Sequence, residues 1–301
     1  MSFTALRKRR QLQQRVRALA PRVLAPGRAA GPGAKGFYLV HYNAPDFLEL
    51  ALDAIGVHHP ESAVTVLDNG SRPEAIDAVK RAVRRRPHVR VLLAHGDKPR
   101  HTVGLQALFA LAVEDGVSTA VFLDQDALLL CPVDDLAARL GANTRLVGAA
   151  DAVFIPRTDG PLKSGWMRSA PSRIHPSLLL LDPSRVRRTL GPWPFAYDRR
   201  AERSARRGGW EYEPYHALSV RAEERIVFLD TRMCEALPPL TFYELGGHAY
   251  ACHAWYSSRT EGRSDTDQVD TLPVAWIKAR RAAILERMRE LASGRYPSSA
   301  R

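Results

Sequence analysis

The chain has 301 residues, of which 45% are apolar and 25% are charged, values typical of a globular protein rather than a disordered or fibrous one. Its 44 Lys and Arg against 32 Asp and Glu give a formal charge of +12. No apolar run approaches the roughly 18 residues of a membrane span, and no apolar segment of a secretory signal follows the basic start. The three cysteines are odd in number and far apart, which excludes a disulfide framework. We therefore expect a cytoplasmic protein.

The excess charge is concentrated at the start of the chain. Residues 1–35 hold nine Lys or Arg and no acid, and residues 25–36 are rich in Gly and Pro. We expect a solvated basic tail with a short helix, followed by a linker. A nucleic-acid arm or peripheral contact with a membrane surface is the alternative interpretation. Residues 36–301 are expected to form a single domain.

Apolar runs and helical patterns alternate in the first half of this domain. Strands are predicted at 37–41, 63–67, 89–94 and 119–123, with helices from residue 46, from residue 71 and over 101–114. After residue 126 the pattern loosens: strands are predicted at 145–150, 177–181 and 226–229, strand or loop at 247–256, a loop or helix at 197–209, and helices at 210–221 and from 273. Strands separated by helices predict an α/β fold with a mostly parallel central sheet flanked by helices.

Polar residues follow the predicted strands where a parallel sheet binds its ligands, at the carboxyl ends. The first strand ends in His41-Tyr42-Asn43, the second in Asp68-Asn69-Gly70-Ser71 and the fourth in Asp124-Gln125-Asp126. No strand is followed by GxGxxG or GxxxxGK[ST], so dinucleotide and Walker-type sites are not expected.

Asp124 and Asp126 are the sharpest chemical feature. Residues two apart in an extended segment point the same way and lie roughly 7 Å apart. Two such carboxylates repel each other unless a cation lies beside them, and hard oxygen ligands suit Mg²⁺ or Mn²⁺. The alternative is an ordinary polar strand end.

The segments 37–43, 64–71 and 121–126 resemble successive signatures of the GT-A glycosyltransferases, family 2-like. The resemblance covers about residues 36–130 and continues more faintly to about residue 260. It implies a GT-A fold with a nucleotide-binding half (36–130), an acceptor-binding half (131–272) and a C-terminal helix (273–293). It also implies that the nucleotide-sugar donor is held by Tyr42, Asn43, Asp68, Asn69, Gly104 and Asp124. The chain departs from the usual pattern at His41, where a small residue is common.

A late histidine often completes the metal site in GT-A enzymes, and the resemblance offers His248 and His253. Two side chains that are five residues apart in an extended segment point to opposite faces, so at most one of the two histidines faces the site. We predict that Asp124, Asp126 and His253 hold Mn²⁺ or Mg²⁺. A histidine packed in the core beside Trp255 is the alternative.

An inverting transferase needs a carboxylate base for the acceptor hydroxyl. Glu213 is the first candidate and Glu211 the second, because both lie in an aromatic and acidic segment that opens a predicted helix. Acids favoured by the helix dipole are the alternative. Asp151 is a further candidate, for base or acceptor contact, and His175 is a candidate contact to donor sugar or acceptor. Asp198 is expected to pair with neighbouring arginines.

The sequence thus predicts a metal-dependent glycosyltransferase, hexosyl- or pentosyltransferase, that acts with inversion. Its donor would be a UDP-, dTDP- or GDP-linked sugar and its acceptor a hydroxyl-bearing molecule. One alternative is a nucleotidyltransferase of related topology, which would need a Gly-rich basic loop where Tyr42-Asn43-Ala44-Pro45 stands. The other is a basic nucleic-acid-binding protein, but no nucleic-acid motif is visible, and we expect no nucleic-acid partner.

Overall fold

A computed structural model describes residues 3–19, 21–94, 101–156, 165–207, 216–222, 225–255, 264, 268–269 and 272–293. The strands of its large sheet are β1 (Arg22–Pro26), β2 (Lys35–His41), β3 (Ala63–Asp68), β4 (Val89–Leu93), β5 (Thr119–Asp124), β6 (Ala127–Leu129), β7 (Leu146–Pro156), β8 (Gly165–Leu181), β9 (Ile226–Met233), β10 (Leu240–Leu245) and β11 (His248–Ala254). A separate pair is formed by β12 (Gln268–Val269) and β13 (Leu272–Pro273).

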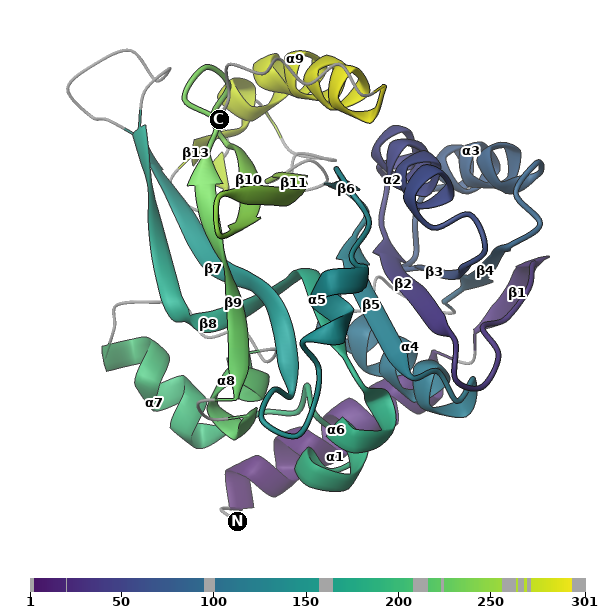
Figure 1. Cartoon of the computed structure of the whole chain (residues 1–301), viewed down its shortest axis with the longest axis vertical. Coiled ribbons are helices and arrows are strands. Elements are labelled where there is room, and N and C mark those ends of the chain that lie inside the picture. Colours follow the sequence, from purple (N-terminus) through teal and green to yellow (C-terminus); the bar gives the residue numbers. More distant parts are fainter. Residues whose placement is uncertain are drawn as a thin grey trace.

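The large sheet has the order β1-β4-β3-β2-β5-β8-β7-β9-β10-β11-β6 (Figure 1). The strands β4, β3, β2 and β5 run parallel, and β8 then pairs antiparallel with β5. Beyond β8 only β7 and β9 pair in parallel. The predicted α/β fold with a flanked central sheet is therefore confirmed. Its parallel part coincides with the half of the chain where strand and helix alternate, and the sheet as a whole is mixed.

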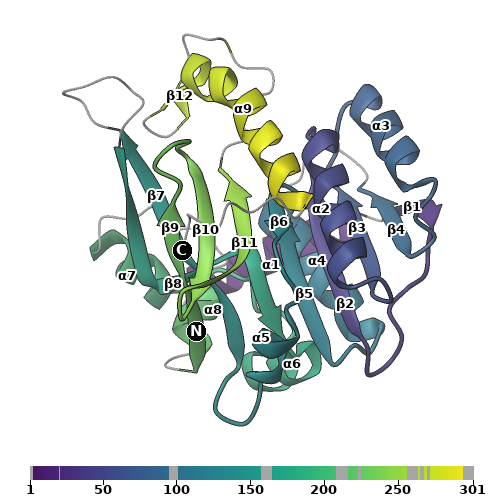
Figure 2. The ribbon, with the colours of Figure 1, turned by 45° about the horizontal axis from the view of Figure 1, so that its top comes forward.

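Helices cover both faces of the sheet (Figures 1 and 2). One face carries α2 (Pro45–His58), α3 (Pro73–Val83) and α9 (Val274–Ala292), and the other carries α1 (Phe3–Ala18), α4 (His101–Glu114), α6 (Pro183–Leu190) and α8 (His216–Ala222). The shorter α5 (Asp134–Ala138) follows β6, and α7 (Arg199–Arg207) precedes α8.

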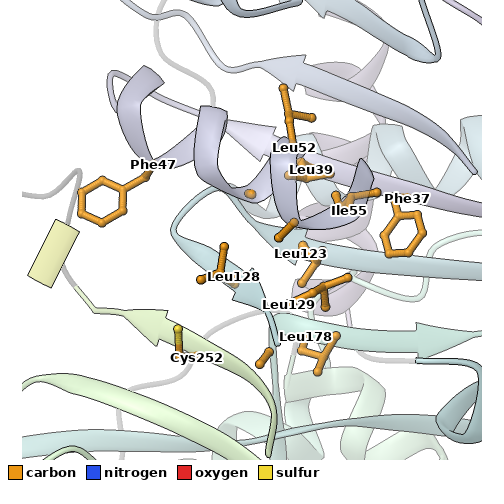
Figure 3. Packing of buried hydrophobic residues seen from close by; sticks show 14 of the residues in the cluster. Phe37, Leu39, Phe47, Leu52, Ile55, Leu123, Leu128, Leu129, Leu178 and Cys252 are labelled. Atoms are coloured by element: carbon orange, nitrogen blue, oxygen red, sulfur yellow. The ribbon is translucent and has the colours of Figure 1, made fainter. Parts of the chain in front are cut away.

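Alternate residues of β2 enter the two cores. Phe37 and Leu39 join the cluster with α2, α3 and α9, whereas Tyr38 and Val40 join the cluster with α1 and α4. Figure 3 shows the first cluster, where the side chain of Ile55 from α2 lies among those of the sheet. A strand buried on both faces reads as an unbroken apolar run, which is why these strands were visible in the sequence.

The N-terminal segment differs from the solvated tail and linker that we predicted. Leu19, directly after α1, is buried, and Leu12 and Val16 pack against the α4 side of the core. The strand β1 then pairs antiparallel with β4 and forms one edge of the sheet. The few apolar residues of α1 are enough to hold it against the core, because they pack on α4, a helix that is buried on most of its surface.

Local details also depart from expectation. The helix predicted from residue 71 begins slightly later: α3 starts after Arg72, and the Ser71 hydroxyl accepts a hydrogen bond from the Asn43 backbone amide. The strands β6 and β10 were not predicted. Among the residues that the structure describes, no helix has the length and apolar character needed to cross a bilayer.

Candidate metal and nucleotide site

The carboxyl ends of β2 and β3 are joined through Asp68. Its Oδ2 lies 2.7 Å from His41 Nδ1, and its Oδ1 accepts from the Ser71 amide at 2.9 Å. Burial alone would raise the pKa of Asp68, but the hydrogen bonds from His41 and Ser71 outweigh it, and the pKa lies below its usual value. The unusual His41 thus has a structural task, because it compensates a carboxylate that is fully buried.

The turn after β2 is held by side chains of its neighbours. Asn43 has a φ of 51°, a left-handed conformation that Asn tolerates better than most residues. Its amide donates to Ser71 Oγ at 2.9 Å, and its Oδ1 accepts from the Arg72 amide at 2.8 Å. The Gln125 side chain accepts from the Tyr42 amide and donates to its carbonyl. The turn is therefore fixed directly to the segment between Asp124 and Asp126.

Two other predicted donor residues have internal contacts. The Asn69 amide donates to the His41 carbonyl at 2.8 Å. A Cβ at Gly104 would approach Val40 Cγ2 to 3.1 Å, so this glycine allows α4 to pack closely on β2. These contacts explain Asn69 and Gly104 structurally, and the donor-binding roles of both residues stay predictions, as do those of Tyr42, Asn43 and Asp68.

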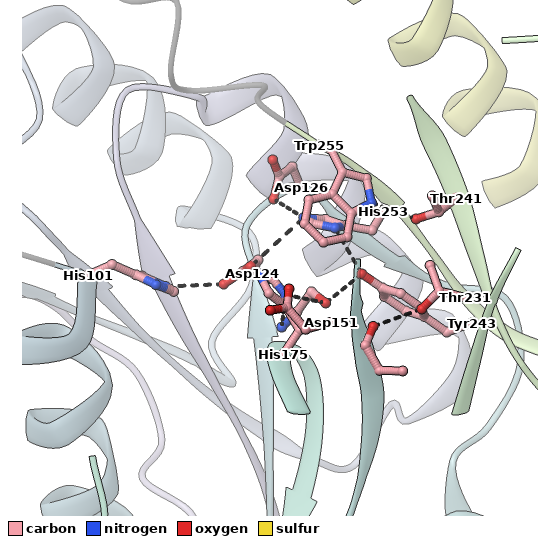
Figure 4. Close-up of polar contacts among 12 residues, drawn as sticks. His101, Asp124, Asp126, Asp151, His175, Thr231, Thr241, Tyr243, His253 and Trp255 are labelled. Carbon is pink, nitrogen blue, oxygen red and sulfur yellow. Dashed lines mark hydrogen bonds and ion pairs between the residues drawn. The ribbon is translucent and has the colours of Figure 1, made fainter. Parts of the chain in front are cut away.

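Three imidazoles surround Asp124 at the end of β5 (Figure 4). Its Oδ1 lies 3.1 Å from His101 Nε2, at the start of α4. Its Oδ2 lies 3.9 Å from His175 Nδ1 and 3.8 Å from His253 Nε2. Burial by itself would raise the pKa of Asp124, but His101, followed by His175 and His253, holds it far below the ordinary range. Asp124 is therefore an ionised carboxylate.

The pairing of β11 with β6 brings His253 to the acid pair. His253 stands opposite Ala127, and the Ala254 amide donates to the Asp126 carbonyl at 2.9 Å. His253 Nε2 consequently lies 3.2 Å from Asp126 Oδ1. One ligand atom each from Asp124, Asp126 and His253 lie within 4.8 Å of one another.

The chemistry of this set fits a divalent cation. Two carboxylates and one imidazole are ligands that Mn²⁺ accepts, and Mg²⁺ accepts the carboxylates. The prediction that these three residues come together is confirmed. The other candidate, His248, is exposed at the far end of β11, where its Nε2 lies 3.2 Å from Cys131 Sγ. Only one of the two histidines lies at the acids, but not because the two point to opposite faces: the register of β11 against β10 shifts between His248 and His253, so His248 is separated by distance along the strand.

A buried hydrogen-bond chain orients His253. His253 Nδ1 lies 2.9 Å from the Tyr243 hydroxyl, which lies 2.6 Å from Ser177 Oγ, and Ser177 Oγ lies 2.8 Å from His175 Nδ1. The Ser177 amide also donates to His175 Nδ1, which makes that nitrogen an acceptor. Burial lowers the pKa of His175 to about 4, so the ring is neutral.

The direction of donation along the chain follows from this acceptor. Ser177 donates to His175, Tyr243 donates to Ser177, and His253 Nδ1–H donates to Tyr243. His253 Nε2 is the nitrogen that faces the acids. Sequence reasoning missed Tyr243 and Ser177, because each lies within an apolar strand and carries no local signal.

The indole of Trp255 closes one side of this cluster. Its ring centroid lies 4.8 Å from that of His175 and 4.7 Å from that of His253, and its Nε1 donates to Thr241 Oγ1 at 2.8 Å. His253 is thus packed beside a tryptophan and also faces the acids, so both predicted interpretations describe part of its environment.

Of the other predicted acids, Asp151 and Asp198 lie beside basic side chains. Asp151 Oδ2 lies 2.9 Å from His216 Nε2 and 3.5 Å from an Arg173 amino nitrogen. Burial would raise the pKa of Asp151, but these partners, with His175, lower it. Asp198 pairs with Arg221, as expected for an acid in an arginine-rich segment. Glu211 and Glu213 lie outside the described residues, so their catalytic role stays a prediction.

Solved structures similar to this one include glycosyltransferases. They include the galactosyltransferase LgtC in complex with donor and acceptor sugar analogs (17% identity over 88% of this chain and 98% of that chain, TM-score 0.45). They also include the mannosyltransferase PcManGT from Pyrobaculum calidifontis in complex with GDP-Man and Mn²⁺ (17% identity, 99% and 85%, TM-score 0.40). A third is GlyE from Streptococcus pneumoniae (12% identity, 65% and 45%, TM-score 0.41). No family model and no curated protein matches the sequence, and the family 2-like assignment stays a prediction.

Proposed function

We propose that the protein is a metal-dependent glycosyltransferase that moves a sugar from a nucleotide-sugar donor to a hydroxyl-bearing acceptor. The observation that carries the proposal is the meeting of Asp124, Asp126 and His253 at the carboxyl end of β5. The turn after β2, which the resemblance assigns to the nucleotide, is hydrogen-bonded to Gln125 between the two acids. Nucleotide and cation would therefore bind side by side.

Each group of residues at the site would have its own role. Asp124, Asp126 and His253 would hold Mn²⁺ or Mg²⁺, and the cation would stabilise the charge of the departing diphosphate. His101 Nε2, 3.1 Å from Asp124 Oδ1, is the contact that most lowers the pKa of Asp124. Tyr243 fixes the His253 ring so that Nε2 faces the acids. The nucleotide would be UDP, dTDP or GDP, held by Tyr42, Asn43, Asp68, Asn69 and Gly104 around the turn after β2.

We further propose that transfer proceeds with inversion and that Glu213, or else Glu211, deprotonates the acceptor. Asp151 suits this task poorly, because His216 and Arg173 already stabilise its ionised form, and a carboxylate with a lowered pKa is a weak base. Its place beside His175 suits a contact to the acceptor instead.

The test is calorimetric binding of UDP, dTDP and GDP with Mn²⁺ and with EDTA. At least one nucleotide should bind more tightly with Mn²⁺, and Asp126→Asn should remove that gain. Asp77→Asn is the matched control, because it removes an exposed carboxylate from α3, far from the acid pair. Equal affinity with and without the metal in the unaltered protein would contradict the proposal. Release of the nucleoside diphosphate from the corresponding sugar donor then measures turnover.

A further inference from the structure

A cavity of about 490 Å³, separate from the acid and histidine cluster, lies between α1, the segment after α6 and the start of α7. Its lining consists of Arg9, Leu190, Gly191, Trp193, Ala196, Tyr197, Asp198, Arg199, Arg200 and Arg221. None of these residues belongs to the acid and histidine cluster around Asp124. The volume lies within the range of small-molecule sites, and the proposed transferase function assigns nothing to it.

Asp198 carries the single carboxylate among the lining residues, and both of its oxygens already accept hydrogen bonds. Asp198 Oδ1 accepts from the Arg200 amide at 2.8 Å and from the Ala201 amide at 3.2 Å, at the start of α7. Its Oδ2 accepts from Arg221 Nε at 3.3 Å. Burial would raise the pKa of Asp198, but these hydrogen bonds lower it. Asp198 therefore belongs to the wall and has little left to offer the other arginines.

The guanidinium of Arg221 is likewise already hydrogen-bonded within the cavity wall. Its two terminal nitrogens donate to the Trp193 carbonyl at 2.9 Å and to the Ala196 carbonyl at 3.2 Å. The pair of Asp198 and Arg221 thus shapes the segment that carries Trp193 and Tyr197. The remaining cationic side chains of the lining are Arg9, Arg199 and Arg200.

Two of these arginines, Arg9 and Arg199, have no carboxylate partner among the described residues, and Arg200 has only a long contact to Asp198. Within the part of the chain that the structure describes, no ion pair joins Arg9 or Arg199 to an acid, and the buried Nε of Arg9 has no hydrogen-bond acceptor. Arg200 Nε lies 4.0 Å from Asp198 Oδ1, and its side chain is 63% exposed. A guanidinium nitrogen buried without an acceptor is unfavourable, so an anion in the cavity would be stabilised.

The helices around the cavity add to its positive potential. The helix α1 carries six Lys or Arg and no acid, α6 carries three Arg and no acid, and α7 carries five Arg and one Glu. That acid, Glu202, accepts from the Tyr197 hydroxyl. Clustered charge of one sign attracts a counter-ion and speeds its association.

We propose that this cavity binds a phosphate-bearing ligand. The phosphate would lie among the guanidiniums of Arg9, Arg199 and Arg200, since the planar fork of Arg matches phosphate oxygens. The apolar part of the ligand would lie against Leu190 and Trp193. The same chemistry is offered by a soluble phosphate ester and by the phosphate headgroup of an anionic lipid, so the experiment has an arm for each.

The test variant Arg9→Gln/Arg199→Gln removes two positive charges from the cavity. The control variant Arg84→Gln/Arg85→Gln also removes two positive charges, from exposed residues just after α3, on the other face of the sheet. Phenyl phosphate binding is measured by calorimetry at about 150 mM salt with EDTA. The EDTA removes divalent cations, so that no metal at Asp124 and Asp126 can bind the phosphate. Binding to phosphatidylcholine vesicles with and without phosphatidic acid is measured by co-sedimentation. We expect affinity for one of the two probes to fall at least tenfold in the cavity variant and to stay unchanged in the control.

Loss of phenyl phosphate binding identifies a soluble ester, and loss of vesicle binding alone identifies a headgroup. Equal losses in the cavity and control variants would overturn the proposal, because general charge would then explain the binding. Absence of binding to both probes in the unaltered protein would overturn it too. If the first variant fails to fold, the exposed pair Arg199→Gln/Arg200→Gln provides the same test.

Discussion

The hydroxyl of Tyr243 should control metal affinity without touching the metal. Tyr243→Phe removes only the oxygen that lies 2.9 Å from His253 Nδ1 and 2.6 Å from Ser177 Oγ, and the ring stays buried. Outer-shell partners of a ligating histidine contribute about 10- to 100-fold in metal affinity. We therefore expect Mn²⁺ to bind about 10- to 100-fold more weakly, which corresponds to about 1.4 to 2.7 kcal/mol.

A matched control separates this effect from loss of stability. Tyr38 is equally buried, and its hydroxyl donates to Asp115 Oδ2 at 3.0 Å, remote from the acid pair. Tyr243→Phe should destabilise the fold by about 1 to 3 kcal/mol in urea, because buried His253 and Ser177 lose a hydrogen-bond partner. Tyr38→Phe should cost about 1 kcal/mol, because Asp115 Oδ2 still accepts from Arg90 at 2.8 Å. Only Tyr243→Phe should weaken Mn²⁺ binding in calorimetry. Unchanged Mn²⁺ affinity in a folded Tyr243→Phe protein would refute the orienting role.

Three further predictions follow from the structure and the sequence. Burial lowers the pKa of His59 from 6.5 to about 4, so the unfolded chain binds more protons than the folded chain between these pH values. The free energy of unfolding should therefore fall by about 3 kcal/mol as pH falls from 6.5 towards 4. In urea titrations, His59→Gln should make this loss of stability smaller. Glu213→Gln should lower turnover by about 10² to 10⁴ while donor affinity stays, with Glu211→Gln as control, and an unchanged rate would reject Glu213. A chain beginning at Gly36 should lose roughly 3 to 6 kcal/mol of unfolding free energy, because it lacks the buried Leu19 and β1; full stability would contradict this.

The parallel half of the fold was readable because its signals are local. The strands β2, β3 and β5 are largely apolar runs buried on both faces and bounded by polar residues, and α4 was predicted at its observed limits, 101–114. The acids Asp124 and Asp126 were found for the same reason, since a strand end is visible within a few residues.

The surroundings of the acids were not readable, because they depend on pairing between distant strands. His253 reaches Asp126 through the register of β11 with β6, across 127 positions of sequence. Tyr243 reaches His253 only because β10 pairs with β11. A one-residue slip in either register would turn these side chains to the opposite face. The sequence could suggest His253 by resemblance, but it contained no sign of the hydroxyls that orient it.

The partners of the acids explain how the site separates binding from proton transfer. Asp68 and Asp151 are buried and Asp124 is partly buried; each lies beside at least one histidine, and each has a lowered pKa. Carboxylates stabilised as anions bind cations or hold loops in place, but they attract protons weakly. A base for the acceptor should instead be a carboxylate without such partners, whose pKa is not lowered. This distinction makes Glu213→Gln the decisive substitution: it should change the rate of transfer alone, whereas replacing Asp126 should first weaken the binding of metal and donor.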